Sequence, residues 1–168
     1  MKTLYLMRHA EALPGKGKMP DYLRPLTYDG VQSVILIGEF LKNKNIGFDS
    51  IITSHAVRAF ETALHLAGQT AFPEPQIIED KRLYNSGIDS YYDVIFEQSD
   101  AIAHLLVVGH NPQITGLANG FLKEKETFLF PANMASFCFQ TDKWSDIRQA
   151  ESACLFVWPA KAEHGIIY

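Results

Sequence analysis

Four residues suited to phosphoryl chemistry stand just after apolar runs of the sequence. Arg8 and His9 end the first run, Arg58 comes shortly after the second, and His110 follows Gly109 at the end of a third. A guanidinium offers a planar fork of donors to phosphate oxygens, and an imidazole can act as a nucleophile or base near neutral pH. Two arginines and two histidines in such positions predict a pocket for a dianionic phosphoryl group.

The elements that would position these residues alternate between strand and helix. Short apolar runs predict buried strands at residues 3–7, 49–53 and 103–108. Stretches of helical periodicity follow each run, at residues 31–41, 57–67 and 114–122. This alternation predicts a three-layer α/β/α sandwich with a mostly parallel central sheet. Ligands bind outside the carboxyl ends of such strands, so the four residues are expected at one edge, near helix N-termini.

Helix starts are predicted from polar residues that cap exposed backbone N–H groups. Thr27 is the expected cap of the first helix, and Ser54 of the helix that carries Arg58. Asp89 and Asn111 are the expected caps of two later helices.

The other segments have weaker patterns. Residues 76–78 predict a short strand, and 135–141 with 153–158 predict a closing antiparallel hairpin. Segment 11–25 is rich in Gly, Pro and Lys, and a loop of this length inside a compact domain is usually functional. We interpret it as a flap over the pocket. Among acidic residues of the motifs, only Glu11 and Glu61 are expected near the cations.

Composition limits the class of protein. The chain has 168 residues, 47% of them hydrophobic and 20% charged, which predicts a single globular domain over residues 1–168. A net charge of −4 argues against a nucleic-acid binder or a protein of anionic membrane surfaces. No apolar stretch approaches the roughly 20 residues of a membrane span. Cys138 and Cys154 lie in separate apolar runs, as expected for a reduced, cytoplasmic protein.

Other catalytic sites fit the sequence less well. Gly15-Lys16-Gly17-Lys18 lacks the spacing and the Ser or Thr of a phosphate-binding P-loop. Ser54 lacks the flanking glycines of a nucleophile elbow. A zinc site would need clustered ligands, and here the histidines have arginine neighbours that oppose a cation. No metal site is therefore expected.

Four motifs in order resemble the histidine phosphatase (phosphoglycerate mutase-like) superfamily. The motifs are Arg8-His9-Ala10-Glu11, Arg24-Pro25-Leu26-Thr27 with Gly30, Ser54 to Thr62 with Arg58, and Gly109-His110-Asn111-Pro112. The short chain and the Arg-Pro-Leu-Thr motif are most similar to the SixA-type phosphohistidine phosphatase branch. The resemblance covers the chain from Met1 to about Leu122 and implies a phosphoglycerate mutase-like fold.

The resemblance also implies a two-step mechanism. His9 would attack phosphorus and become transiently phosphorylated, and water would then hydrolyse the intermediate. Arg8 and Arg58 would bind the phosphate oxygens, and His110 would add a hydrogen bond and positive charge. Arg24 is expected to reach the same phosphate. No metal or other cofactor is needed if these groups supply the charge.

One departure from the family pattern bears on the substrate. Where many members carry a Glu or Asp proton donor, this chain has Asn85, which cannot donate a catalytic proton. Glu79, Asp80 and Asp89 stand nearby without matching the pattern. An alkoxide leaving group needs protonation, whereas a protonated phosphohistidine leaves as neutral imidazole, whose conjugate acid has a pKa near 6.5. The missing acid favours phosphohistidine as the substrate.

The predicted function is hydrolysis of phosphohistidine in a protein, such as a His-containing phosphotransfer domain of a signal-transduction chain. The alternative within the same fold is a phosphomonoesterase acting on a small phosphorylated metabolite, a sugar phosphate or a nucleotide. A mutase fits the sequence less well, because it would need an acid/base group and a pocket that retains the intermediate, and this short chain has few residues for a deep lid. A non-catalytic phosphate-binding module is a further alternative, but it would gain nothing from a positioned nucleophile.

Overall fold

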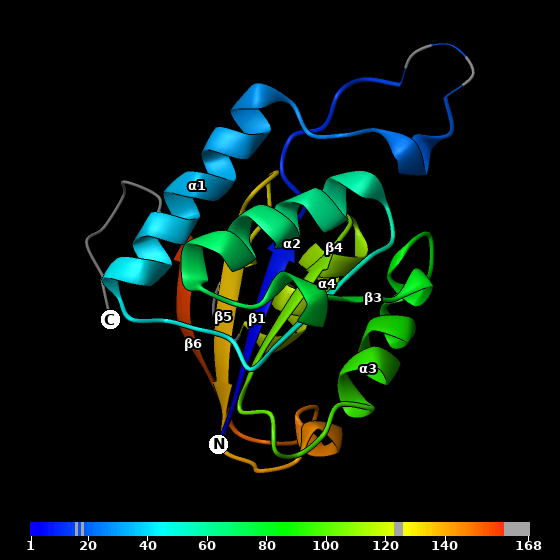
Figure 1. Ribbon diagram of the computed structural model, residues 1–168. Helices are drawn as coiled ribbons and strands as arrows, with labels where there is room; N and C mark the ends of the chain where they lie inside the picture. The colour runs from blue at the N-terminus through cyan, green and yellow to red at the C-terminus, as the bar shows by residue number, and fades with distance from the viewer. Residues whose placement is uncertain (16, 18, 123–125, 160–168) are drawn as a thin grey trace.

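The computed structural model describes residues 1–15, 17, 19–122 and 126–159, and its centre is a six-stranded sheet (Figure 1). The sheet has the order β3-β2-β4-β1-β5-β6. Its strands are β1 (Lys2–Arg8), β2 (Ser50–Thr53), β3 (Ile78–Glu79), β4 (His104–Gly109), β5 (Met134–Phe139) and β6 (Ser152–Trp158). Strands β1 to β4 are parallel, and β5 and β6 add an antiparallel edge. The predicted mostly parallel sheet with a closing hairpin is confirmed.

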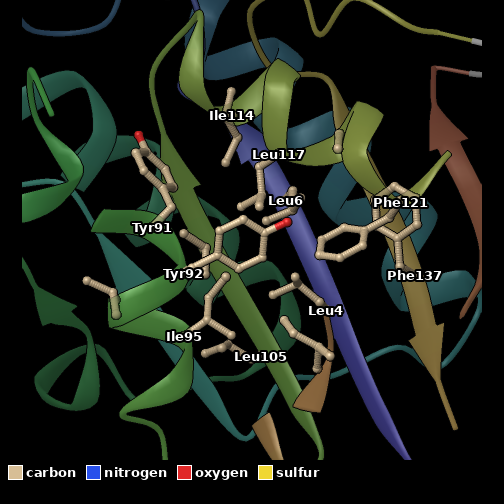
Figure 2. Close-up of a cluster of buried hydrophobic side chains, with 14 of the residues drawn as sticks. Leu4, Leu6, Tyr91, Tyr92, Ile95, Leu105, Ile114, Leu117, Phe121 and Phe137 are labelled. Carbon is tan, nitrogen blue, oxygen red and sulfur yellow. The ribbon is translucent and has the colours of Figure 1, made fainter. Parts of the chain in front are cut away.

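Helices cover both faces of this sheet, namely α1 (Tyr28–Asn43), α2 (Val57–Thr70), α3 (Ile88–Phe96) and α4 (Gln113–Phe121). Side chains alternate between the faces along each strand. Leu4 and Leu6 of β1 pack in one core with α3 and α4, shown in Figure 2. Tyr5 and Met7 pack in a second core with α1 and α2. The three-layer α/β/α arrangement follows from this alternation, as predicted.

The strand register brings the predicted site residues to one edge. Arg8 pairs with Gly109 between β1 and β4, and Thr53 pairs with Val108 between β2 and β4. The three strands therefore end almost level. Beyond them, the N–H of His9 donates to the carbonyl of Gly109 at 3.1 Å, which extends the pairing into the turn after β1.

Thr27 caps α1 as predicted, whereas Ser54 does not cap α2. The Thr27 hydroxyl accepts a hydrogen bond from the N–H of Gly30 at 2.9 Å. The N-cap of α2 is Ala56, and Ser54 Oγ accepts from the N–H of Ala56 before the helix begins. The serine therefore stabilises the turn from β2 into α2, an alternative that short polar side chains often adopt.

Two further cap predictions are wrong. Gly87 is the N-cap of α3, and Asp89 lies inside the first turn, where its carboxylate pairs with an arginine. Pro112 is the N-cap of α4, and the Asn111 amide donates to the carbonyl of Leu129 at 2.9 Å. In both places a tertiary partner takes the side chain that the local pattern assigned to the helix end.

The loops also differ in detail from the predictions. The short strand covers Ile78–Glu79 because Glu74–Gln76 forms a 3₁₀ turn before it. Within segment 11–25, Asp21–Leu23 forms a 3₁₀ turn. The segment extends beyond the carboxyl edge of the sheet in Figure 1. Two residues of the rejected P-loop pattern, Lys16 and Lys18, lie outside the described residues.

Cys138 on β5 and Cys154 on β6 are free, partly buried thiols. No helix in the described part of the chain is long and apolar enough to cross a bilayer.

Candidate active site

His9 lies in the turn after β1 with one ring nitrogen fixed by the backbone. Its Nδ1–H donates to the carbonyl of Ala10 at 2.7 Å, which leaves the lone pair on Nε2. Burial and the charges of Arg58, Arg8 and Arg24 lower the pKa of His9 to about 4. The imidazole is therefore neutral at pH 7 and has the protonation state of a nucleophile.

Arg58, in the first turn of α2, faces the nitrogen that carries this lone pair. Its Nε–H donates to His9 Nε2 at 3.3 Å. The helix is tied to the end of β1 through Thr62, whose hydroxyl donates to the carbonyl of Arg58 and accepts from the N–H of Ala10 at 3.0 Å. This link between helix and turn gives Thr62 of the predicted motif a defined role in the fold.

His110 follows β4 and faces His9, with 5.0 Å between the two ring centroids. Neither of its ring nitrogens has a hydrogen-bond partner among the described residues. Burial, together with the neighbouring His9 and Arg58, lowers the pKa of His110 to about 3. The positive charge predicted for His110 is therefore wrong for the structure as it stands, and the ring can offer one neutral N–H to a ligand.

Arg8 leaves the end of β1 beside His9. Its Nη1–H donates to the carbonyl of Leu129 at 3.1 Å, and its guanidinium carbon lies 5.9 Å from the ring centre of Phe128. The Nε–H is buried and has no partner among the described residues. Arg8 is thus anchored at one amino group and retains further donors.

In the described part of the chain no hydrogen bond joins Arg24 to His9, and Arg24 is linked to Arg58 through Asp21. Arg24 Nε and Nη2 lie 2.8 and 2.7 Å from Asp21 Oδ1, and Nη1 donates to the carbonyl of Leu13. Arg58 Nη2 donates to Asp21 Oδ2 at 2.9 Å, and Nη1 donates to the backbone carbonyl of Asp21 at 2.8 Å. Two of the predicted phosphate ligands therefore share one carboxylate.

Sequence reasoning missed Asp21 and expected Glu11 and Glu61 instead. Both glutamates brace the loop, since Glu11 accepts from the Thr27 hydroxyl and Glu61 from the N–H of Leu26 at 2.7 Å. The available signal was the position of Asp21, three residues before the arginine of the Arg-Pro-Leu-Thr motif.

Aromatic rings line the approach to the two histidines. The Tyr84 ring lies 5.3 Å from His110 and 5.1 Å from His55, and Tyr22 lies 5.7 Å from His55. The Tyr84 hydroxyl donates to Asp21 Oδ2 at 2.8 Å. His55 thus flanks the cluster through ring contacts.

The carboxylates that stood near the family's acid position are engaged elsewhere or exposed. Asp80 pairs with Arg82 and Asp89 with Arg148, while Glu79 is exposed on the short strand β3. Asn85 is itself exposed, in a left-handed conformation with φ of 55°.

Asp21 is ionised and cannot act as a proton donor in this arrangement. Burial alone would raise its pKa, but hydrogen bonds from Tyr84 and Arg24 and the nearby charge of Arg58 outweigh that effect and lower the pKa to about 2.

The described residues contain no group of three or more His, Cys, Asp or Glu side chains that could hold a metal ion. The arrangement places the neutral imidazole of His9 among arginines.

Comparison with known proteins assigns the chain to a family. Residues 4–98 match the model of the histidine phosphatase superfamily (branch 1). An uncharacterized protein of Mycobacterium tuberculosis is 27% identical over 150 residues, which cover 84% of this chain and 91% of that protein. An uncharacterized protein of Picosynechococcus is 32% identical over 113 residues, covering 66% and 67% of the two chains.

Solved structures share the fold across nearly the whole chain. A protein from Nakamurella multipartitia that carries the name of the phosphohistidine phosphatase SixA superposes with a TM-score of 0.76 at 27% identity, covering 93% of this chain and 94% of that one. A mycobacterial glucosyl-3-phosphoglycerate phosphatase shows the same fold with a TM-score of 0.65 at 14% identity, covering 91% and 96%. The chain belongs to the histidine phosphatase superfamily, within which it is SixA-like.

Proposed function

We propose that this protein hydrolyses phosphohistidine in other proteins, without a metal, through a phosphorylated His9. The family and its solved neighbours support a phosphatase, and the SixA-like neighbour supports phosphohistidine in particular. The observation that carries the proposal is a neutral His9 whose Nε2 lone pair meets Arg58, in a cluster whose carboxylate is ionised.

The first step transfers the phosphoryl group to the enzyme. The substrate phosphohistidine reacts with its other ring nitrogen protonated. His9 Nε2 attacks phosphorus in line while the bond from phosphorus to the substrate's ring nitrogen breaks, and the electron pair of that bond stays with the ring, which leaves as neutral imidazole. Before substrate binds, the Arg58 Nε–H donates to the lone pair of His9 Nε2. When the substrate enters, one of its phosphate oxygens can accept this hydrogen bond instead, which frees the lone pair of His9 for attack. Arg8 and Arg58 offset the charge on the equatorial oxygens, and His110 can donate one hydrogen bond.

The second step returns the enzyme to its starting state. Water attacks phosphorus, the bond to His9 Nε2 breaks, and its electron pair becomes the nitrogen lone pair again. The proton lost by water goes to the released phosphate or to solvent. The Nδ1–H bond to the carbonyl of Ala10 holds the ring in one orientation through both steps.

Substrate preference follows from the protonation state of Asp21. An ester would expel an alkoxide, which needs a proton, and general acid catalysis of that step is worth about 10²- to 10⁴-fold in rate. A carboxylate with a pKa of about 2 cannot supply this proton at pH 7. A leaving imidazole, with a conjugate-acid pKa near 6.5, needs little help.

A paired assay in EDTA tests the substrate proposal. The values of kcat/KM are compared for a phosphohistidine-containing phosphotransfer protein, para-nitrophenyl phosphate and a panel of sugar phosphates. We expect a preference of at least about 100-fold for the phosphohistidine protein over sugar phosphates, the lower end of the value of a general acid. Comparable turnover of a sugar phosphate would favour the small-molecule phosphomonoesterase instead, a function known for the mycobacterial neighbour.

His9→Ala tests the nucleophile in the same assay. We expect loss of turnover and loss of the ³²P label that the wild type retains after denaturation at alkaline pH, where an N–P bond survives. His65→Ala is the matched control, because His65 lies on α2 outside the cluster. Substantial activity in His9→Ala would exclude His9 as the nucleophile.

A further inference from the structure

Asp21 connects two arginines of the candidate site although it lies outside the strand ends. Its Oδ1 accepts from Arg24, and its Oδ2 accepts from Arg58 and from the hydroxyl of Tyr84. Its backbone carbonyl accepts a further bond from Arg58. One loop residue therefore holds three side chains that come from separate parts of the chain.

We propose that Asp21 is a positioning residue that orients Arg58 and Arg24 for binding a phosphoryl group. The inference rests on the proposed function only in taking these arginines as phosphate ligands. It does not depend on which phosphorylated substrate the protein uses.

The contacts with Arg58 fix the plane of its guanidinium. Asp21 holds Nη1 through its backbone carbonyl at 2.8 Å and Nη2 through Oδ2 at 2.9 Å, and Nε–H then points to His9 Nε2. Three separate bonds to one planar group leave it little freedom to rotate. The direction of Nε–H toward the nucleophile is thus set from the far side by Asp21.

The burial of Arg58 explains why its carboxylate partner comes from a loop. The side chain of Arg58 is 6% exposed and that of Asp21 is 53% exposed, so the carboxylate reaches the buried guanidinium from the solvent side. Among the described residues Asp21 is the only carboxylate paired with Arg58, and a buried cation without such a partner is costly. The same carboxylate also pairs with Arg24, which directly follows the 3₁₀ turn Asp21–Leu23.

Tyr84 supports the carboxylate from another direction. Its hydroxyl donates to Asp21 Oδ2, and its ring centre lies 5.8 Å from the guanidinium carbon of Arg58. The aromatic wall and the loop residue therefore act on the same arginine.

The opposite role for Asp21 makes the opposite prediction. A carboxylate that occupied the arginines in place of phosphate would compete with the ligand, and its removal would tighten binding. A positioning carboxylate uses the N–H groups that do not face His9, and its removal weakens binding. The sign of the change in anion affinity therefore decides between the two roles.

The test measures orthovanadate binding by calorimetry in the full-length chain. Asp21→Asn keeps the size of the side chain and removes its charge. We expect vanadate to bind about three- to tenfold more weakly, a modest loss because a half-exposed ion pair is screened by water. Tyr84→Phe, which removes one bond to Asp21, should give a smaller change in the same direction.

Two controls separate positioning from a general effect. Asp142→Asn removes the same charge from an exposed residue that follows β5. Because β5 is antiparallel to β1, Asp142 lies near the amino end of β1, away from the site, and its replacement should leave vanadate affinity unchanged. In an Arg58→Ala background, Asp21→Asn should weaken vanadate binding by a smaller factor than in the wild type, because only the contact of Asp21 with Arg24 then remains.

Each other outcome overturns the inference. Tighter vanadate binding by Asp21→Asn would show competition with the anion, and unchanged binding would show no role. An equal loss with and without Arg58 would show that Asp21 does not act through Arg58, which would overturn the inference. If the wild type itself failed to bind vanadate, the phosphate site would be refuted and the proposed function with it.

Discussion

His9 and His110 face each other at the sheet edge as two neutral rings. Burial lowers the pKa values of both rings most, and the nearby arginines lower them further, to about 4 for His9 and about 3 for His110. A neutral His9 keeps its lone pair available for attack on phosphorus. In the proposed mechanism the arginines serve twice, because the charge that would bind the phosphate also lowers the pKa of His9 and keeps it unprotonated.

This electrostatic coupling can be measured by NMR titration of the histidine ring nitrogens. We expect His9 to remain neutral at pH 5.5 in the wild type. In Arg58→Ala its pKa should rise toward the ordinary value of about 6.5, because removal of a nearby cation favours the protonated ring. Arg148→Ala, which removes an arginine paired with Asp89, is the control and should leave the His9 titration unchanged. A wild-type His9 that titrates near pH 6.5 would contradict the account.

The end of β4 and the helix α3 position His110 together. The Tyr91 hydroxyl, from α3, accepts the N–H of His110 at 3.0 Å and donates to the carbonyl of Leu83 at 2.9 Å. Gly109 leaves the room for this hydroxyl, since a Cβ at that position would overlap it. The glycine of the Gly-His motif is therefore explained by a close approach between strand and helix.

Gly109→Ala should destabilise the fold and disturb the site at once. Tyr91 or the strand end would have to move, and overpacking of this kind costs about 1–3 kcal/mol. We expect a lower urea midpoint together with a several-fold loss in kcat/KM for the best substrate of the paired assay. Gly68→Ala is the matched control, because a Cβ there, in α2, would meet nothing within 4 Å. Wild-type stability and activity in Gly109→Ala would show that the contact is unimportant.

The stability of the whole molecule is expected to depend on pH through these two histidines. Their folded-state pKa values lie below the unfolded value of about 6.5. Between pH 6.5 and 4 the unfolded chain therefore binds protons that the folded chain does not, and the free energy of unfolding falls as the pH falls. The loss by pH 4 is on the order of 2–3 kcal/mol for each histidine.

Urea unfolding between pH 7 and 4.5, followed by the fluorescence of the fully buried Trp144, measures this loss. His110→Gln removes one of the two titrating groups. The slope of unfolding free energy against pH should then be about half that of the wild type over the range from pH 6.5 to 4.5, whatever the variant's stability at pH 7. An unchanged slope would assign the acid sensitivity to other groups.

The sequence alone determined the framework and predicted that Arg8, His9, Arg58 and His110 meet at one place. Apolar runs that end in Arg8-His9 and Gly109-His110 predicted strands whose polar ends meet at one sheet edge. This worked because hydrophobic runs and helical periodicity record burial locally, and because parallel strands place their carboxyl ends together. The alternation of strand and helix likewise determined the three layers.

Only the tertiary structure decided how the site is held and charged. Asp21 and Tyr84 come from irregular segments without periodicity, so no pattern placed them against Arg58. The neutral state of His110 depends on desolvation by everything packed around it, which a motif does not record. Ser54 and Asn111 do not cap helices because their side chains have other hydrogen-bond partners. The Ser54 hydroxyl accepts from the N–H of Ala56 in the turn before α2, and the Asn111 amide donates to the carbonyl of Leu129 across the fold.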